Sequence, residues 1–224
     1  MTIHIQPASI NQAASIAQLK SVVWPDEMAN AEQVAQALRQ PDHRAFVALA
    51  DQRVVGFVDA FPTTNAAGHT RWEIDLLAVH PAYQGQKIGQ RLIEAAVQAG
   101  QPHPITSRAL IQVDNHASQG AFRRCGFSPD WQVYQLMIAT GQQAGNPQPL
   151  EQAVLIPVVT MNYSGLWLEG TFSAANLRAA QAECHRRDSS LVGALIPTNQ
   201  AQALAAAETL GYAPIELFHW WLKT

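Results

Sequence analysis

The fold of this chain is decided by the stretch Leu76-Leu77-Ala78-Val79-His80-Pro81-Ala82-Tyr83-Gln84-Gly85-Gln86-Lys87-Ile88-Gly89. An apolar, strand-like run opens it, and a loop with two glycines leads into residues 90–99, whose apolar side chains recur at helical spacing. Backbone N–H groups in such a loop and in the first helical turn are unpaired, and the helix dipole favours negative charge there. The stretch therefore predicts a strand, a phosphate-binding loop and a helix, with a plain tight turn as the alternative.

The spacing of the glycines excludes two common nucleotide sites. Neither the dinucleotide pattern Gly-x-Gly-x-x-Gly nor a P-loop ending in Gly-Lys-Ser/Thr is present in residues 84–89. Any phosphate bound by this loop belongs to another type of site.

Strand-like and helix-like patterns alternate on both sides of this stretch, which predicts an α/β fold of the α+β kind, with a mixed sheet and flanking helices. Residues 46–50 and 54–58 are separated by a short polar link and predict an antiparallel hairpin. The other predicted strands are residues 4–7, 72–79, 109–113 and 133–138, and the predicted helices are residues 10–23, 31–39, 90–99 and 117–125.

Residues 141–152 are rich in Gly, Gln, Pro and Asn, so we predict that they link a domain of residues 1–140 to a smaller unit of residues 153–224. The two sides match at a constant offset of 85 positions (194 − 109 = 211 − 126 = 85). The matched pairs are Ala109-Leu110-Ile111 with Ala194-Leu195-Ile196, and Gly126-Phe127 with Gly211-Tyr212. The smaller unit is expected to be a degenerate half-domain that repeats the end of the first, with an unrelated αβ extension as the alternative.

Three ordered motifs resemble the GNAT family of N-acetyltransferases, over residues 1–140. Gln84, Ile88 and Gly89 fit the family signature Arg/Gln-x-x-Gly-x-Gly/Ala between a strand and a helix. The run at residues 76–85 looks like the strand before that signature, and residues 114–127 look like the later segment that contains Asn115 and ends in Gly-Phe. The resemblance implies a mixed, mostly antiparallel sheet flanked by helices, and transfer of an acetyl group from acetyl-CoA to a primary amine of a small molecule or a peptide.

The same resemblance implies a set of acetyl-CoA-binding residues. Backbone amides around Leu77, Ala78 and Val79 would bind the acetyl carbonyl and the pantetheine arm. The pyrophosphate would lie on the loop of Gln84, Gly85, Gln86, Lys87, Ile88, Gly89 and Gln90, and the segment with Asn115, Ser118 and Phe122 would complete the CoA site. The loop that matches residues 84–89 in the smaller unit is residues 169–174, which has an acidic residue and no basic one, so we expect a single CoA site.

Two residues depart from the family pattern. Lys87 stands where the signature has its first glycine, and we expect it to keep ordinary backbone angles and to place a positive charge near the phosphates. Phe122 stands where many members have a tyrosine that protonates the departing thiolate, so another acid, a water molecule or no acid at all must serve.

Two carboxylates on the predicted strand are candidates for the general base. Strand alternation directs Trp72, Ile74 and Leu76 to one face and Glu73 and Asp75 to the other. Glu73 resembles the general-base glutamate of family members that acetylate lysine, and a base is required because an amine is mostly protonated at neutral pH. The alternative is that both carboxylates are solvated residues of an exposed strand.

Composition narrows the class of partner. The 224 residues carry a net charge of −3, without charge runs, which gives no footprint for nucleic acid or for an anionic membrane. No segment at the start resembles a signal peptide and none is apolar enough to span a bilayer, so we expect a cytoplasmic protein.

Two cysteines and eight histidines at no ligand spacing predict no metal. The remaining alternative is a non-catalytic acyl-CoA-binding or scaffold protein of the same fold; the oligomeric state is not predicted.

Overall fold

The computed structural model describes residues 2–27, 29–100, 106–141 and 148–224. Its first segment contains the strands β1 (Ile3–Pro7), β2 (Phe46–Ala50), β3 (Arg53–Thr64), β4 (Thr70–Val79), β5 (Thr106–Gln112), β6 (Ser128–Pro129) and β7 (Tyr134–Ala139). The helices of this segment are α1 (Ala13–Val23), α2 (Ala31–Leu38), α3 (Ile88–Ala99) and α4 (His116–Arg124), with short 3-10 turns at Ile10–Gln12 and Pro81–Tyr83. The second segment contains β8 (Ala153–Val159), β9 (Ser164–Gly170), α5 (Ala174–Arg186), β10 (Leu191–Pro197), α6 (Ala201–Thr209) and β11 (Ala213–Lys223).

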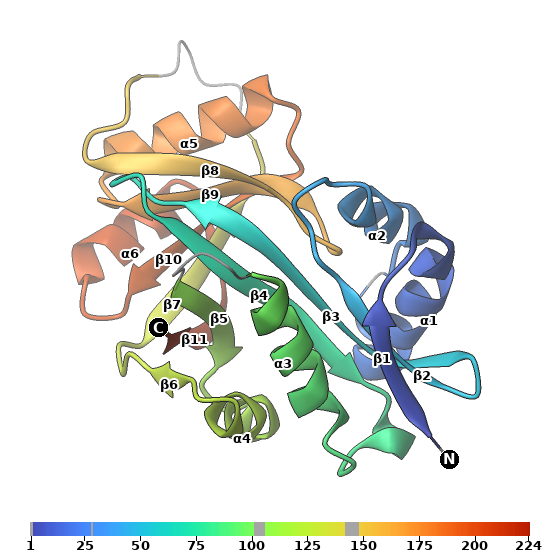
Figure 1. The fold of residues 1–224 in the computed structure, drawn as a ribbon. Coiled ribbons are helices and arrows are strands. Elements are labelled where there is room, and N and C mark those ends of the chain that lie inside the picture. Colours follow the sequence, from blue (N-terminus) through green and yellow to red (C-terminus); the bar gives the residue numbers. More distant parts are fainter. Residues whose placement is uncertain (1, 28, 101–105, 142–147) are drawn as a thin grey trace.

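All eleven strands of the described residues join one sheet, in the order β1-β2-β3-β4-β5-β11-β7-β10-β9-β8, with β6 paired to β11 (Figure 1). Among the strands of the described residues, only the pairs β4–β5 and β9–β10 are parallel. The predicted mixed, mostly antiparallel sheet is therefore confirmed, as is the antiparallel hairpin of β2 and β3.

The last strand of the chain lies inside the sheet rather than at its edge. β11 pairs with β5 on one side and with β7 on the other, so β7 contacts β11 and β10 instead of β5. Each segment thus places a strand within the sheet of the other. The sequence analysis expected residues 133–138 to close the first unit by themselves; in the structure they lie between two strands of the second segment.

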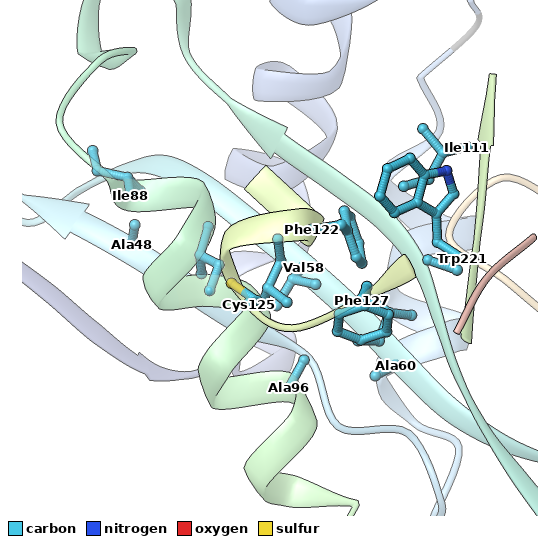
Figure 2. Close-up of a cluster of buried hydrophobic side chains, with 14 of the residues drawn as sticks. Ala48, Val58, Ala60, Ile88, Ala96, Ile111, Phe122, Cys125, Phe127 and Trp221 are labelled. Carbon is cyan, nitrogen blue, oxygen red and sulfur yellow. The ribbon is translucent and has the colours of Figure 1, made fainter. Parts of the chain in front are cut away.

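Three pairs of helices pack on this sheet, and each pair forms a hydrophobic core with it. α3 and α4 pack on one face of β3, β4 and β5 around Ile88, Phe122 and Phe127 (Figure 2). α1 and α2 pack on the opposite face around Ile16, Val34 and Phe57. α5 and α6 cover β7, β9 and β10 in a third cluster.

Local structure repeats at the predicted offset of 85 positions. β5 and β10 differ by 85 at both ends, and so do α4 and α6 (191 − 106 = 201 − 116 = 85). Gly126 and Gly211 both have positive φ, of 87° and 80°, which glycine adopts without strain. The division into a domain, a linker and a half-domain stays a prediction, since one sheet joins the two segments and residues 142–147 of the expected linker lie outside the described residues.

Within the part of the chain that the structure describes, none of the helices has both the length and the apolar character needed to cross a membrane.

Candidate active site

β4 and β5 separate in the middle of the sheet. Their parallel pairing is limited to Arg71 with Thr106, Trp72 with Ser107 and Glu73 with Arg108. From Ile74 to Val79, β4 is paired only with β3 on its other side, and the continuation of β5 is paired only with β11. Backbone groups on the facing edges of the two strands are thus free to bind a ligand that lies between them.

The three residues predicted to bind the acetyl group and the pantetheine arm lie at the end of β4. Leu77 and Val79 are half-buried and direct their side chains toward α3, whereas Ala78 is buried on the opposite face. A Cβ atom added to Gly89 would lie 3.9 Å from Leu77 Cδ2 and from Val79 Cγ2. The first turn of α3 therefore lies directly beside the free edge of β4.

The predicted pyrophosphate loop connects β4 to α3. Gln84, Gly85, Gln86 and Lys87 are exposed, Gly89 and Gln90 are half-buried, and Ile88 anchors the helix in the core with 1% exposure. Gln84 Nε2 donates to Val79 O at 3.3 Å, which holds the loop against the end of the strand. No side chain caps the start of α3, so its first N–H groups remain available to an anion.

Lys87 has the backbone conformation that the sequence analysis did not expect. Its φ is 59° and its ψ is 17°, in the left-handed region, immediately before α3 begins. The expectation of ordinary angles is wrong because the turn between the strand and the helix requires a positive φ at this position. For a residue with a Cβ atom this conformation costs about 1–2 kcal/mol.

The α4 segment contributes one capped helix end and one core residue. Asn115 Oδ1 accepts a hydrogen bond from Ser118 N at 3.0 Å and thereby caps α4. Phe122 is 3% exposed and packs edge to face on Phe127, with 5.1 Å between the ring centroids (Figure 2). Phe122 therefore belongs to the core between α3 and α4. Its ring has no hydroxyl group that could protonate a thiolate.

A bulge in β4 corrects the predicted alternation. Val58 pairs with Leu77 and Ala60 pairs with Ile74, so Asp75 and Leu76 together lie opposite the single residue Asp59. Because of the extra residue, Leu76 packs with the α1 and α2 cluster rather than on the face of Trp72 and Ile74. The prediction for Leu76 is wrong, since it assumed an uninterrupted strand.

Glu73 is buried in a network of charged residues. Its side chain is 2% exposed, receives two bonds from Arg108 Nε, at 2.9 and 2.8 Å, and also accepts one from Thr63 Oγ1. Arg71 Nη1 binds both oxygens of Glu169 on β9, at 2.7 and 2.8 Å. Glu73 thus binds Arg108 on β5 directly, and Arg71 and Arg108 connect this carboxylate to Glu169 on β9.

The carboxyl group of Asp75 has a raised pKa. It is partly buried, and burial, followed by the nearby charges of Asp59 and Glu73, raises its pKa to about 7. The positive charges of His43 and Lys20 act in the opposite direction. A carboxyl group of this kind can take a proton from an amine more readily than an ordinary aspartate.

Residues of the second segment lie next to this carboxylate. Lys20 on α1 is 1% exposed, and its Nζ donates to Met161 O at 2.9 Å and to Asn162 Oδ1 in the turn between β8 and β9. The next residue, Tyr163, has a pKa raised above its usual value by burial and by the charge of Asp75. The β8–β9 turn thus covers the face of β4 that carries Asp75.

Four residues of this environment, Lys20, His43, Asp59 and Tyr163, were not found by sequence reasoning. One signal was available, because Asp59 interrupts the apolar run of β3 and is fully buried. Within the described ranges, no group of three or more His, Cys, Asp or Glu side chains is arranged to hold a metal ion, and the absence of a metal stays a prediction.

Comparisons with known proteins bear on the family and the fold of this chain. Residues 11–127 match a family model described as the acetyltransferase (GNAT) family. No curated protein matches the sequence.

Solved structures share the fold at low sequence identity. A GCN5-related N-acetyltransferase from Sphaerobacter thermophilus is 13% identical, with a TM-score of 0.64 over 99% of this chain and 95% of that chain. The glucosamine N-acetyltransferase region of a fungal multi-domain GH3 beta-N-acetylglucosaminidase is 11% identical, with a TM-score of 0.67 over 99% of this chain and 38% of that chain. Arabidopsis thaliana NAA60 in complex with acetyl-CoA is 16% identical, with a TM-score of 0.53 over 59% of this chain and 88% of that chain. In the first two the likeness extends over both segments.

Proposed function

This chain belongs to the GNAT acetyltransferase family, and we propose that it transfers an acetyl group from acetyl-CoA to a primary amine by direct attack. The observation that carries the proposal is the separation of β4 from β5 beside the uncapped first turn of α3. Acetyl-CoA is a ligand of the Arabidopsis thaliana neighbour, which supports the same co-substrate here.

Acetyl-CoA would lie with its pyrophosphate on residues 84–90 and its pantetheine arm between β4 and β5. N–H groups of the loop and of the first turn of α3 would bind the phosphates, together with the positive charge of Lys87. Backbone N–H groups around residues 77–79 would bind the thioester carbonyl and stabilise the negative charge that develops on its oxygen.

Asp75 is the residue that we assign as general base, in preference to Glu73. The ammonium form of the substrate gives a proton to the Asp75 carboxylate, and the neutral nitrogen then attacks the thioester carbon. A C–N bond forms and the C–S bond breaks, and CoA leaves as a thiolate. The second proton lost by the nitrogen neutralises this thiolate, directly or through water, because Phe122 has no proton to give.

Two measurements separate this enzyme from a scaffold that only binds CoA. Calorimetric titration with acetyl-CoA tests binding, with one site per chain as the expected result. Release of free thiol is then followed with a small amine, an aminoglycoside, a peptide amino terminus and a lysine peptide as acceptors. Binding combined with amine-dependent release supports the enzyme, and binding without release under all four conditions supports the scaffold.

A further inference from the structure

A buried carboxylate lies behind Asp75, and the proposed reaction does not yet use it. Asp59, in the middle of β3, is 0% exposed. Its Oδ1 lies 3.2 Å from Nδ1 of His43, and its Oδ2 has no hydrogen-bond partner among the described residues. A buried carboxylate oxygen without a donor is costly, so the arrangement calls for a proton or a cation at Oδ2.

The β4 bulge places Asp75 opposite Asp59. Asp59 faces the two residues of the bulge, Asp75 and Leu76, across the β3–β4 ladder. Opposed side chains of neighbouring antiparallel strands are close enough to interact, and in a bulge two residues share one opposite residue. His43 is fixed in turn, because its ring stacks on Phe61 with 4.7 Å between centroids and an interplanar angle of 17°.

We propose that Asp75 and Asp59 form a carboxylate pair that shares one proton, with His43 as the residue that positions Asp59. The proposal deepens the proposed function, on which its catalytic meaning rests. Two adjacent carboxylates in a poorly solvated site do not both ionise readily, so the pair holds one proton until the pH is well above the usual range of an aspartate. When Asp75 takes the proton of the amine, its new O–H donates to Oδ2 of Asp59, and that oxygen obtains its missing partner.

Other charged groups face the pair and set its total charge. Glu73 lies on the same strand as Asp75, Lys20 comes from α1, and Tyr163 comes from the β8–β9 turn. Glu73 is neutralised by Arg108, and Lys20 is directed to Met161 O and Asn162. His43 is therefore the basic side chain in direct contact with Asp59, and a charge on its ring would oppose proton uptake by Asp75.

The experiment is an infrared titration of the ligand-free protein, which follows the carbonyl band of a protonated carboxyl group between pH 4 and pH 9. In the unmodified protein we expect a band that disappears near pH 7 and is missing in Asp75→Asn. In Asp59→Asn the midpoint should fall by about one pH unit or more, because the second carboxylate is gone. In His43→Asn, which keeps a donor beside Asp59 but carries no charge, the midpoint should rise.

Asp130→Asn is the matched control, because Asp130 receives a hydrogen bond from Tyr134 Oη at 2.8 Å and belongs to another part of the chain. Its band should match that of the unmodified protein. A midpoint that stays fixed in both Asp59→Asn and His43→Asn overturns the pair, as does absence of any band that titrates near pH 7. If Asp59→Asn does not fold, the midpoint in His43→Asn decides by itself, and a fixed midpoint there overturns the pair. The titration needs no substrate, so it tests the pair independently of acetyl transfer. If the titration is as expected but the protein transfers no acetyl group, the proposed function is contradicted and the carboxylate pair still stands.

Discussion

Arg108 donates through a single nitrogen, Nε, to both carboxylate oxygens of Glu73, at 2.9 and 2.8 Å. The two residues lie opposite each other at the last pair of the β4–β5 ladder, immediately before the strands separate. This ion pair thus fixes the point at which the proposed CoA site opens. We infer from this ion pair that Glu73 supports the structure of the site, whereas the family resemblance had suggested the general base.

Replacement of Glu73 by Gln should therefore lower the free energy of unfolding. Arg108 would be left in a buried position with one of its two nearby carboxylates missing, which costs about 3–5 kcal/mol. The free energy of unfolding from urea titration measures this loss. Glu32→Gln is the matched control, because Glu32 pairs with Arg39 at 2.8 Å on the surface and its loss should cost less than about 1 kcal/mol.

Turnover by the folded fraction of the Glu73→Gln protein decides between the two roles. We expect it to stay within about tenfold of the unmodified enzyme, since a general base typically contributes a hundredfold or more. A stable variant that has lost its turnover would return the role of base to Glu73.

Local patterns were sufficient to predict most elements of the first segment. The β2–β3 hairpin and α3 follow from alternation and helical spacing within short windows. The position of β11 between β5 and β7 does not, because a strand has the same local pattern whichever neighbours it pairs with. Strand exchange between the segments depends on pairing between residues that are far apart in the sequence. A pattern within a short stretch of sequence therefore cannot predict it.

Replacement of Asp75 by Asn should stabilise the fold at high pH. Ordinary aspartate has a pKa of 3.8, and the folded protein raises that of Asp75 to about 7, so ionisation of Asp75 opposes folding progressively between these values. The melting temperature of the variant relative to the unmodified protein should therefore increase from pH 4 to pH 7 and remain constant above. Above pH 7 the variant should gain on the order of 2 kcal/mol in free energy of unfolding. This is less than the full pKa shift implies, because the side chain is partly exposed. A difference that is independent of pH would contradict the raised pKa.

Replacement of Lys87 by Gly should relieve the left-handed backbone. Glycine adopts a φ of 59° without the clash of a Cβ atom, so the variant should gain about 1 kcal/mol in free energy of unfolding. Lys87→Ala keeps the Cβ atom and removes the charge, and it should gain no stability. Both variants should bind acetyl-CoA with a weaker dependence on salt, because both lose the ammonium group. Equal stability of the Gly and Ala variants would show that the backbone is not strained.

Replacement of Gly89 by Val should weaken acetyl-CoA binding by about tenfold or more without unfolding the protein. The space around its Cα is open to a Cβ atom, whose nearest neighbours are Leu77 and Val79 at 3.9 Å, so the fold tolerates a side chain there. That same space lies beside the free edge of β4, where a branched side chain would obstruct the proposed ligand. Calorimetry measures the affinity, and Gly120→Ala on α4 controls for substitution of a helical glycine. An unchanged affinity would remove Gly89 from the site.

The site itself was only partly accessible to sequence reasoning. Glycines and the strand-loop-helix order predict that residues 84–90 bind phosphate, because a phosphate site is made by consecutive backbone groups. Asp75 was predicted as a candidate, but its proposed partner Asp59 lies opposite it only through a bulge that arises from pairing between two strands. Lys87 was misjudged because a positive φ imposed on a residue other than glycine leaves no mark in the sequence.

Amine-dependent release of thiol from acetyl-CoA, compared between the unmodified protein and Asp75→Asn, tests the central claim most directly. With an amine that serves as substrate, we expect the unmodified protein to release thiol in proportion to amide formed. Asp75→Asn should be slower by roughly ten- to ten-thousandfold at neutral pH, with unchanged affinity for acetyl-CoA, because asparagine keeps the size of the side chain but accepts no proton. Full activity of Asp75→Asn across the pH range, or binding of acetyl-CoA with no amine-dependent release in the unmodified protein, would contradict the account.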